Sequence, residues 1–332
     1  MSLHTRALPI SAAAVFILSL AVPAAGADLP PHAPLRILIV SDEVNPHALT
    51  DPELTQPGDL SAAISAPGSG LSIDTVTEIA TDDIATATTA LSVPFGDPSA
   101  YDVLVYFAHR IPAGGGGAAD QAAFVVAVEA FLVAGGGVVS FHHGSYLTAG
   151  KTAMQDIIGA TASGSVPWNT VTGQNVINVA PIHFVTSNGV DYSGTVAYSD
   201  LGRGVPAATY DMFTNVPDER YIEFELNPGA GTIEMLFGSD YVENGSTHIL
   251  GFTHHRPAWA GIVVAYQPGE YQPNAVDDLD GNNFQILANA IIYAAGAAPL
   301  PTTVPAANAW ALLLLAMLLV VVSLRRIAIK AR

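Results

Sequence analysis

Residues 118–146 read AADQAAFVVAVEAFLVAGGGVVSFHHGSY, and this stretch decides the fold. Apolar side chains recur at helical spacing through 118–134, which predicts a helix. Gly135 follows at the position where a helix commonly ends in a left-handed residue. The apolar run at 137–143 then predicts a buried strand. A helix that leads directly into a buried strand is typical of βαβ units, which build parallel sheets covered on both faces.

The segments on either side continue this alternation of strands and helices. Further strands are predicted at 35–40, 72–78, 101–107, 175–180, 232–237, 247–254 and 261–266, and further helices at 145–158 and 283–295. The stretches 41–71 and 80–100 are rich in Ala, Thr, Pro and Gly, so we expect surface loops there. The sequence therefore predicts one α/β domain at 28–296 with a doubly wound, mainly parallel sheet.

The charged residues and the absence of cysteine exclude several classes of function. Between Asp28 and Leu300 the chain carries six basic residues against all 29 acidic residues of the protein. A surface this acidic repels a phosphate backbone, so no nucleic acid is expected as a partner. Without cysteine, the chain cannot form disulfides, bind zinc through thiolates or use a thiol nucleophile.

The amino-terminal segment has the pattern of a secretory signal. Arg6 supplies a positive charge, residues 8–22 are apolar, and Ala25-Gly26-Ala27 forms a small-residue cleavage site. We therefore predict a signal peptide at 1–27 that is removed before Asp28. The alternative is an uncleaved membrane anchor, for which the apolar run is short.

The carboxyl-terminal segment has the pattern of a membrane-tethered tail. A linker at 297–308 precedes an apolar run at 309–324, which we predict to be a transmembrane helix, and a basic tail at 325–332. The run VPAANAW followed by leucines and two arginines resembles the IPTL-CTERM and PEP-CTERM sorting signals of bacteria. This resemblance implies export to the cell envelope or the exterior, at least transient tethering by the helix, and a sorting protease as partner. A plain single-span anchor is the alternative.

Titratable side chains follow three of the predicted strands at the point where each strand ends. Asp42 follows the first strand, His109 follows 101–107, and His142 and His143 close the strand at 137–143. In an open parallel sheet, ligands bind beyond the carboxyl ends of the strands, near the point where strand order reverses. We therefore expect Asp42, His109 and His142 to approach one another in one crevice.

The turn after the strand at 137–143 has the layout of a nucleophile elbow. An amidotransferase elbow has the form G-x-C-x-G, and Ser140-Phe141-His142-His143-Gly144 occupies that frame with His142 at the position of the thiol. The frame of a serine elbow, G-x-S-x-G, is absent. The sequence thus predicts an elbow that presents a histidine.

Six segments, in order, resemble motifs of the ThuA-like (trehalose-utilisation) family. They are LRILIVSDEVNPH (35–47), YDVLVYF (101–107), GGGVVSFHHGSY (135–146), PIHFVTSNGV (181–190), PDERYIEF (217–224) and RPAWAGIVVAYQPGEYQ (256–272). The sequence departs from the family pattern at Phe184, where the family has Pro, and at Glu270, where it has His. The resemblance implies a flavodoxin-like fold of the class I glutamine-amidotransferase type without the thiol, and an association with carbohydrate metabolism.

A site for a carbohydrate or another small polar ligand needs carboxylates for hydroxyl groups and an aromatic face for the ring. The catalytic candidates are His142, Asp42, Asp218 and Glu219, and the substrate-binding candidates are His109, His143, Tyr221, Trp259 and Glu270. For Asp218 and Glu219 an exposed turn is the alternative, and for Trp259 it is packing in the core.

A metal site is the remaining alternative. His142 or His143, with His254 or His255 and a carboxylate, could bind a divalent ion, but no H-x-x-x-H or H-E-x-x-H spacing occurs. We therefore predict neither a metal nor another cofactor. Two hypotheses remain beside a His/carboxylate metal-dependent hydrolase: an exported protein that acts on or binds a carbohydrate, and a non-catalytic module for surface binding or assembly.

Overall fold

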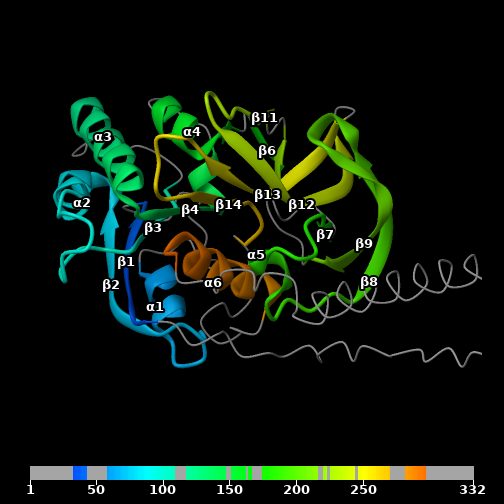
Figure 1. The fold of residues 1–332 in the computed structure, drawn as a ribbon, viewed down its shortest axis with the longest axis horizontal. Coiled ribbons are helices and arrows are strands. Elements are labelled where there is room, and N and C mark those ends of the chain that lie inside the picture. Colours follow the sequence, from blue (N-terminus) through cyan, green and yellow to red (C-terminus); the bar gives the residue numbers. More distant parts are fainter. Residues whose placement is uncertain are drawn as a thin grey trace, which may run out of the picture.

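Five strands form the parallel half of a mixed sheet in the computed structural model of the chain (Figure 1). They are β1 (Leu35–Ser41), β2 (Ile73–Ala80), β3 (Val103–Tyr106), β4 (Gly137–Phe141) and β14 (Val263–Tyr266). Their order is β2-β1-β3-β4-β14, and every neighbouring pair is parallel. β1, β3 and β4, which correspond to the strands predicted at 35–40, 101–107 and 137–143, are neighbours in this parallel half.

The structure describes residues 33–42, 58–108, 117–146, 151–161, 164–166, 174–215, 220–222, 225–243, 246–269 and 281–296. Within these ranges the sheet continues beyond β14 as an antiparallel half. Its strands are β13 (Ser246–His255), β12 (Thr232–Glu243), β7 (Asn175–Asn178), β9 (Val205–Thr214) and β8 (Gly194–Asp200), in this order across the sheet. The parallel arrangement is therefore limited to one half of the sheet, and Figure 1 shows the antiparallel half curving away at β8 and β9.

Two strands of the antiparallel half lie where none was predicted. Most side chains of β9 are exposed, and those of β8 alternate between exposed and partly buried positions. A strand that packs against the core on one side has fewer apolar residues than a strand buried on both sides, so it is harder to recognise in the sequence. Two small ribbons complete the described strands: β5 (Ala160–Thr161) with β11 (Glu225–Leu226), and β6 (Gly164–Val166) with β10 (Arg220–Ile222).

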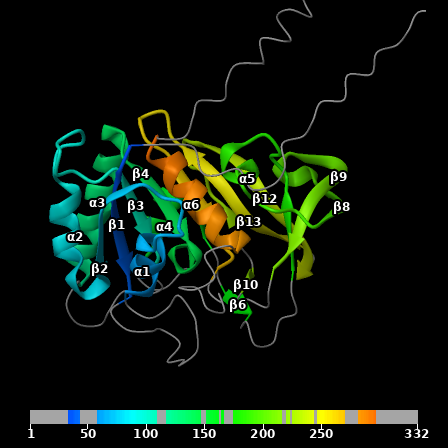
Figure 2. The same cartoon turned by 90° about the horizontal axis from the view of Figure 1, so that it is seen from below.

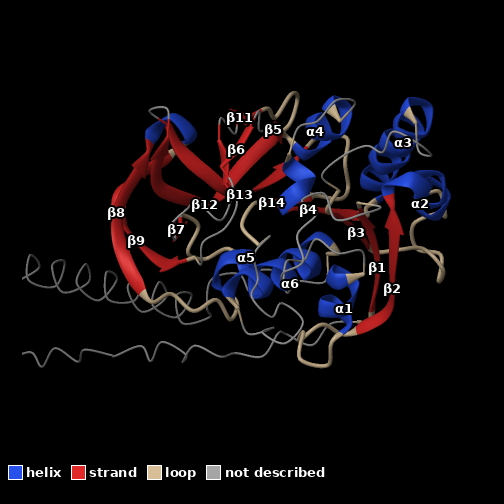
Figure 3. Cartoon of the chain, turned by 180° about the vertical axis from the view of Figure 1, so that it is seen from behind, coloured by secondary structure: helices blue, strands red, loops and turns tan. Residues whose placement is uncertain are grey.

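Helices cover both faces of the parallel half, as expected for a doubly wound fold (Figures 1 and 3). One face carries α2 (Ile84–Leu91), α3 (Ala118–Ala134) and α4 (Thr152–Ile158), and the other carries α1 (Asp59–Ser65), α5 (Phe184–Ser187) and α6 (Asn282–Ala294). Figure 2 shows α6 lying along the strands beside α1. The predicted stop of α3 is confirmed, since Gly135 has a φ of 113°.

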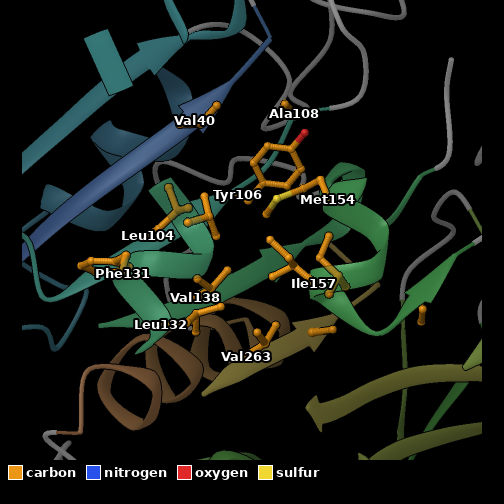
Figure 4. Close-up of a cluster of buried hydrophobic side chains, with 14 of the residues drawn as sticks. Val40, Leu104, Tyr106, Ala108, Phe131, Leu132, Val138, Met154, Ile157 and Val263 are labelled. Atoms are coloured by element: carbon orange, nitrogen blue, oxygen red, sulfur yellow. The ribbon is translucent and has the colours of Figure 1, made fainter. Parts of the chain in front are cut away.

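The core is divided by the sheet into two layers. Alternate residues of each strand point to opposite faces, so Leu104 and Val138 pack with α3 and α4 (Figure 4), whereas Val105 and Val139 pack with α1 and α6. Burial on both faces explains why β1, β3, β4 and β14 are largely apolar, whereas the edge strand β2 is only partly buried and more polar. The parallel sheet thus provides a rigid base for the loops at its carboxyl edge.

Two predicted loops contain helices, and one predicted helix is shorter than expected. The stretch 41–71 contains α1, and the stretch 80–100 contains α2, although both are rich in Ala and Thr. Each helix buries one face against the core. The buried residues are Leu60, Ala63 and Ile64 in α1, and Ile84, Ala87 and Leu91 in α2. The helix predicted at 145–158 begins only at Thr152.

The predicted signal peptide (1–27), linker (297–308), transmembrane helix (309–324) and basic tail (325–332) lie outside the described residues. Within the ranges that the structure describes, no helix is long and apolar enough to cross a membrane.

Candidate functional site

The elbow predicted after β4 is present as a strained turn. The strand ends at Phe141, and His142–Ser145 form a 3₁₀ turn in place of the predicted strand end. His142 has a φ of 38°, and it is the one non-glycine residue with a positive φ in the described ranges. Such a conformation disfavours residues with a side chain and persists where the surroundings hold it.

Glycine at position 144 allows the elbow to lie directly on the neighbouring strand. A Cβ atom on Gly144 would lie 2.3 Å from the carbonyl oxygen of Tyr106 at the end of β3. The side chain of Gln155 in α4 donates to the carbonyls of Gly144 and Tyr146, at 3.0 and 3.2 Å. The turn is therefore held from both sides, which fixes His142 in its strained conformation.

His142 is fully buried and fixed by a hydrogen bond to the loop after β14. Its Nδ1 lies 2.7 Å from the carbonyl oxygen of Gln267. A carbonyl only accepts, so Nδ1 carries the proton of the neutral imidazole and Nε2 is the basic nitrogen. This tautomer suits a general base or a hydrogen-bond acceptor.

His143 and Asp42 lie beside His142. The rings of His142 and His143 are 4.6 Å apart between centroids, and His143 stacks on Phe107 at 4.9 Å. Nδ1 of His143 is 4.0 Å from Oδ2 of Asp42, which is 4% exposed at the end of β1. The structure therefore brings together Asp42, His142 and His143, which the sequence placed at the ends of two separate strands.

Lys151 belongs to the same cluster and was not among the predicted site residues. Its Nζ donates to the carbonyls of Ala108 (2.7 Å) and His143 (3.1 Å) and lies 5.3 Å from the centre of the Tyr106 ring. Burial lowers the pKa of Lys151 to about 7, and the nearby carboxylate of Asp42 opposes that shift. Burial, with Asp42 as the second cause, also raises the pKa of Tyr106.

One feature of the sequence indicates a specific role for Lys151. Lys151 and Lys330 are the only lysines of the chain, and Lys151 is therefore the single lysine of the α/β domain. A lone lysine directly before a helix that follows the elbow was an indication of a specific role. We call Asp42, Tyr106, His142, His143 and Lys151 the elbow cluster.

The elbow cluster lies at the topological switch point of the sheet. The order β2-β1-β3-β4 reverses direction between β1 and β3. Asp42 directly follows β1, while Tyr106 ends β3 and Ala108 comes shortly after it. Ligands of open α/β sheets bind at this point, outside the carboxyl ends of the strands.

Comparisons with solved structures identify the fold. A ThuA-like protein from Parabacteroides merdae aligns with a TM-score of 0.51 and 14% identity, over 81% of this chain and 92% of its own. The fold is ThuA-like. A ThuA-like protein from Bacteroides uniformis (TM-score 0.46, 17% identity, 82% and 95% of the two chains) and a β-galactosidase from Bacillus circulans (0.41, 12%, 80% and 32%) are also similar. No protein-family model and no curated protein matches the sequence.

The match confirms, at the level of the fold, the resemblance that the six motifs indicated. At 14% identity it establishes the arrangement of strands and helices, whereas ligands and reactions of one fold vary with its loops. The function of this ThuA-like fold must therefore be argued from its own side chains.

Trp259, one of the substrate-binding candidates, lies at the opposite edge of the sheet. It precedes β14, whereas His142 follows β4, and these two strands are parallel. Its indole Nε1 donates to Oε1 of Glu129 at 2.8 Å, and the side chain is buried against α3. Packing in the core is the role that the structure shows for Trp259.

The histidines at the end of β13 are also remote from the elbow. Nδ1 of His254 is 2.8 Å from the carbonyl of Ile157, and its Nε2 is 3.1 Å from the carbonyl of Pro228. His254 and His255 therefore cannot join His142 or His143 around one ion. In the described part of the chain, no group of three or more His, Asp or Glu side chains is arranged to hold a metal.

The remaining predicted residues are not placed by the structure. His109, Asp218, Glu219 and Glu270 lie outside the described residues, and of Tyr221 the backbone is described, paired with Ser165 between β10 and β6. The elbow cluster is thus the part of the predicted site on which a functional argument can rest.

Proposed function

We propose that the ThuA-like domain binds a carbohydrate or a similar polyhydroxylated ligand at the elbow cluster. The observation that carries the proposal is the convergence of a carboxylate, two imidazoles and an amine at the switch point of the sheet. The carboxylate of Asp42 can accept hydrogen bonds from hydroxyl groups, and His143 is held beside it by stacking on the buried ring of Phe107. This combination suits a ring that carries several hydroxyl groups.

The elbow cluster also has the parts for proton transfer at a ligand hydroxyl. With Nδ1 of His142 hydrogen-bonded to Gln267, its Nε2 can take a proton from a hydroxyl group. Lys151, with a pKa near 7, can hold or release a proton close to neutral pH. Thiol chemistry is excluded because the chain has no cysteine.

A second candidate function is a binding or assembly module that keeps the fold without catalysis. Burial favours it: Asp42, His142, His143 and Lys151 are all at most 4% exposed. Lys151 donates hydrogen bonds to the backbone carbonyls of Ala108 and His143, as expected for a group that ties two loops together. In this case the elbow cluster is a structural polar network.

The substitution His142→Asn separates the two candidates. The Asn amide can occupy the place of Nδ1 and donate to Gln267, and Asn tolerates a positive φ, but nothing replaces Nε2. We expect unchanged thermal unfolding and at least tenfold weaker binding of the ligand found by calorimetric screening of mono- and disaccharides. The control is His255→Asn, which changes an exposed histidine at the opposite edge.

Three outcomes of this experiment distinguish the ligand site from the structural module. Loss of binding with an unchanged unfolding temperature supports a ligand site at the elbow. No binding of any saccharide by the native protein, together with a large loss of stability in His142→Asn, supports the structural module. Equal binding by wild type and variant overturns the assignment of the site.

We also propose that the protein is exported and that the elbow cluster meets its ligand outside the cytoplasm. The signal-like segment at 1–27 and the apolar run at 309–324 support this placement. A sorting protease that cleaves near the linker at 297–308 is part of the same proposal.

A further inference from the structure

A cavity lies at the edge of the sheet opposite the elbow cluster. Its volume is about 830 Å³, within the usual range for small-molecule sites. Residues of the β7–α5 segment, the turn before β9, the start of β12 and the end of α6 line it. One of them, Tyr293, is next to Ala294, whose carbonyl would lie 2.1 Å from a Cβ on Gly137 at the start of β4. The cavity is therefore at the amino edge of the parallel strands, and we call it the amino-edge cavity.

Its walls are largely apolar. Phe184 of α5, Val205 of β9, and Ile233 and Met235 of β12 contribute from three different elements. Ile182, another lining residue, is 95% exposed, so an apolar side chain stands at the opening of the cavity. This surface suits a ligand with an apolar body.

Glu234 places one uncompensated negative charge at this apolar surface. The side chain is exposed, and no ion pair or hydrogen bond joins it to another residue in the part of the chain that the structure describes. Arg203 also lines the cavity, but its guanidinium lies 2.6 Å from the carboxylate of Asp200. The positive charge of Arg203 is thereby compensated, and Glu234 decides the charge of the cavity.

His183 lines the same cavity as a neutral side chain, so it adds no positive charge there. Its Nδ1 accepts from the backbone N–H of Val185 at 3.2 Å, so the proton of the neutral ring is on Nε2. Nε2 is buried and has no hydrogen-bond partner among the described residues. Burial lowers the pKa of His183, which keeps the ring neutral at pH 7, and its ring lies 4.5 Å from that of Tyr293.

We propose that the amino-edge cavity binds a small organic amine, with its ammonium group at Glu234 and its apolar body against Phe184, Val205 and Met235. A charge-assisted hydrogen bond to a carboxylate that has no other partner is strong, and the rings of Phe184 and Tyr293 add surface that is favourable to a cation. The net charge of the protein, −18, attracts cations over the whole molecule. This site is independent of the carbohydrate proposal, because it uses none of the residues of the elbow cluster.

The probe is phenethylamine, titrated calorimetrically into the full-length protein at pH 7 and low ionic strength. Two compounds of similar shape serve as comparisons: 2-phenylethanol, which is neutral, and phenylacetate, which is anionic. We expect the amine to bind at least tenfold more tightly than the alcohol and the anion to show no binding. Equal affinities of the amine and the alcohol would overturn the role of Glu234, and no binding of the amine would overturn the site.

Two variants test the charges. Glu234→Gln keeps the shape of the side chain, and we expect at least a tenfold loss of affinity for the amine. Asp200→Asn leaves Arg203 uncompensated beside the cavity, and we expect a loss of several-fold through repulsion. The matched control is Glu225→Gln, another exposed glutamate on a strand edge.

His142→Asn is the control for independence and should bind the amine as the wild type does. Unchanged affinity in Glu234→Gln would contradict the proposal even if the amine binds, because the ammonium would then lie elsewhere.

Discussion

Nδ1 of His142 and the carbonyl oxygen of Gln267 lie 2.7 Å apart, although 125 residues separate them in the chain. The bond joins the elbow after β4 to the loop after β14, the neighbouring strand in the sheet. It fixes both the tautomer and the position of His142. The elbow thus depends on a part of the chain that is far downstream of its own motif.

The close approach of Gly144 to β3 predicts a large effect of a single methyl group. In Gly144→Ala the new Cβ would lie 2.3 Å from the carbonyl oxygen of Tyr106 and 2.7 Å from Oγ of Ser140. We expect a loss of about 2 kcal/mol in the free energy of unfolding, measured by urea titration. Gly117→Ala is the control, since nothing lies within 4 Å of its Cβ. Equal stability of both variants would show that the elbow is not held against β3.

Lys151 predicts a specific dependence of stability on pH. Its pKa is about 7 in the folded protein and about 10.5 in the unfolded chain, so between these values the unfolded state binds more protons. Stability should therefore rise with pH from about 7 towards 10, by up to about 1.4 kcal/mol per pH unit. Above pH 10 the trend should reverse, because Tyr106 and Tyr192 have raised pKa values and hold their protons only in the folded state.

The substitution Lys151→Met tests whether Lys151 causes this dependence of stability on pH. Urea unfolding at pH 7.5, 8.5 and 9.5 should give a rising stability for the native protein and a nearly flat one for the variant. A variant with the same slope as the native protein would show that Lys151 is charged in the folded state.

Trp259→Phe distinguishes a core tryptophan from a ligand-binding one. The change removes the hydrogen bond from Nε1 to Glu129 and part of the contact with Arg256, whose guanidinium carbon is 4.8 Å from the ring. We expect a loss of about 1–2 kcal/mol in the free energy of unfolding and unchanged saccharide binding. Weaker binding at unchanged stability would contradict the position of Trp259 at the amino edge.

The segment at 1–27 predicts that the mature protein begins at Asp28. Amino-terminal sequencing of the protein recovered from membranes or from the medium is the measurement. Replacing Ala27 with Pro should block cleavage and increase the size of the recovered protein. A cytoplasmic protein that retains Met1 would refute both the signal peptide and the proposed location.

The parallel half of the fold could be predicted because its central strands are buried on both faces. β1, β3 and β4 are largely apolar, and the glycines after α3 mark its end. β8 and β9 were not predicted because partly exposed strands contain fewer apolar residues by which a strand is recognised. The helices α1 and α2 were not predicted because each buries only three residues within a stretch rich in Ala, Thr, Pro and Gly.

The site was predictable only where it follows a strand. Asp42, His142 and His143 were found because the ends of parallel strands meet at one edge. Lys151 precedes a helix, and its burial depends on packing against Tyr106, which no local pattern reveals. The amino-edge cavity combines side chains from separate segments between Val179 and Tyr293, so its shape exists only after folding.

The position of β14 also has a consequence for the order of folding. This strand is inserted between β4 and β13, and in the chain it comes after both. Until residues 263–266 take their place, the parallel and antiparallel halves each expose an unpaired central edge. The hairpin of β12 and β13 can form locally, but the joining of the two halves requires contacts across more than a hundred residues, which are slow to form. A chain that is truncated before Val263 should therefore remain open and aggregate through these edges.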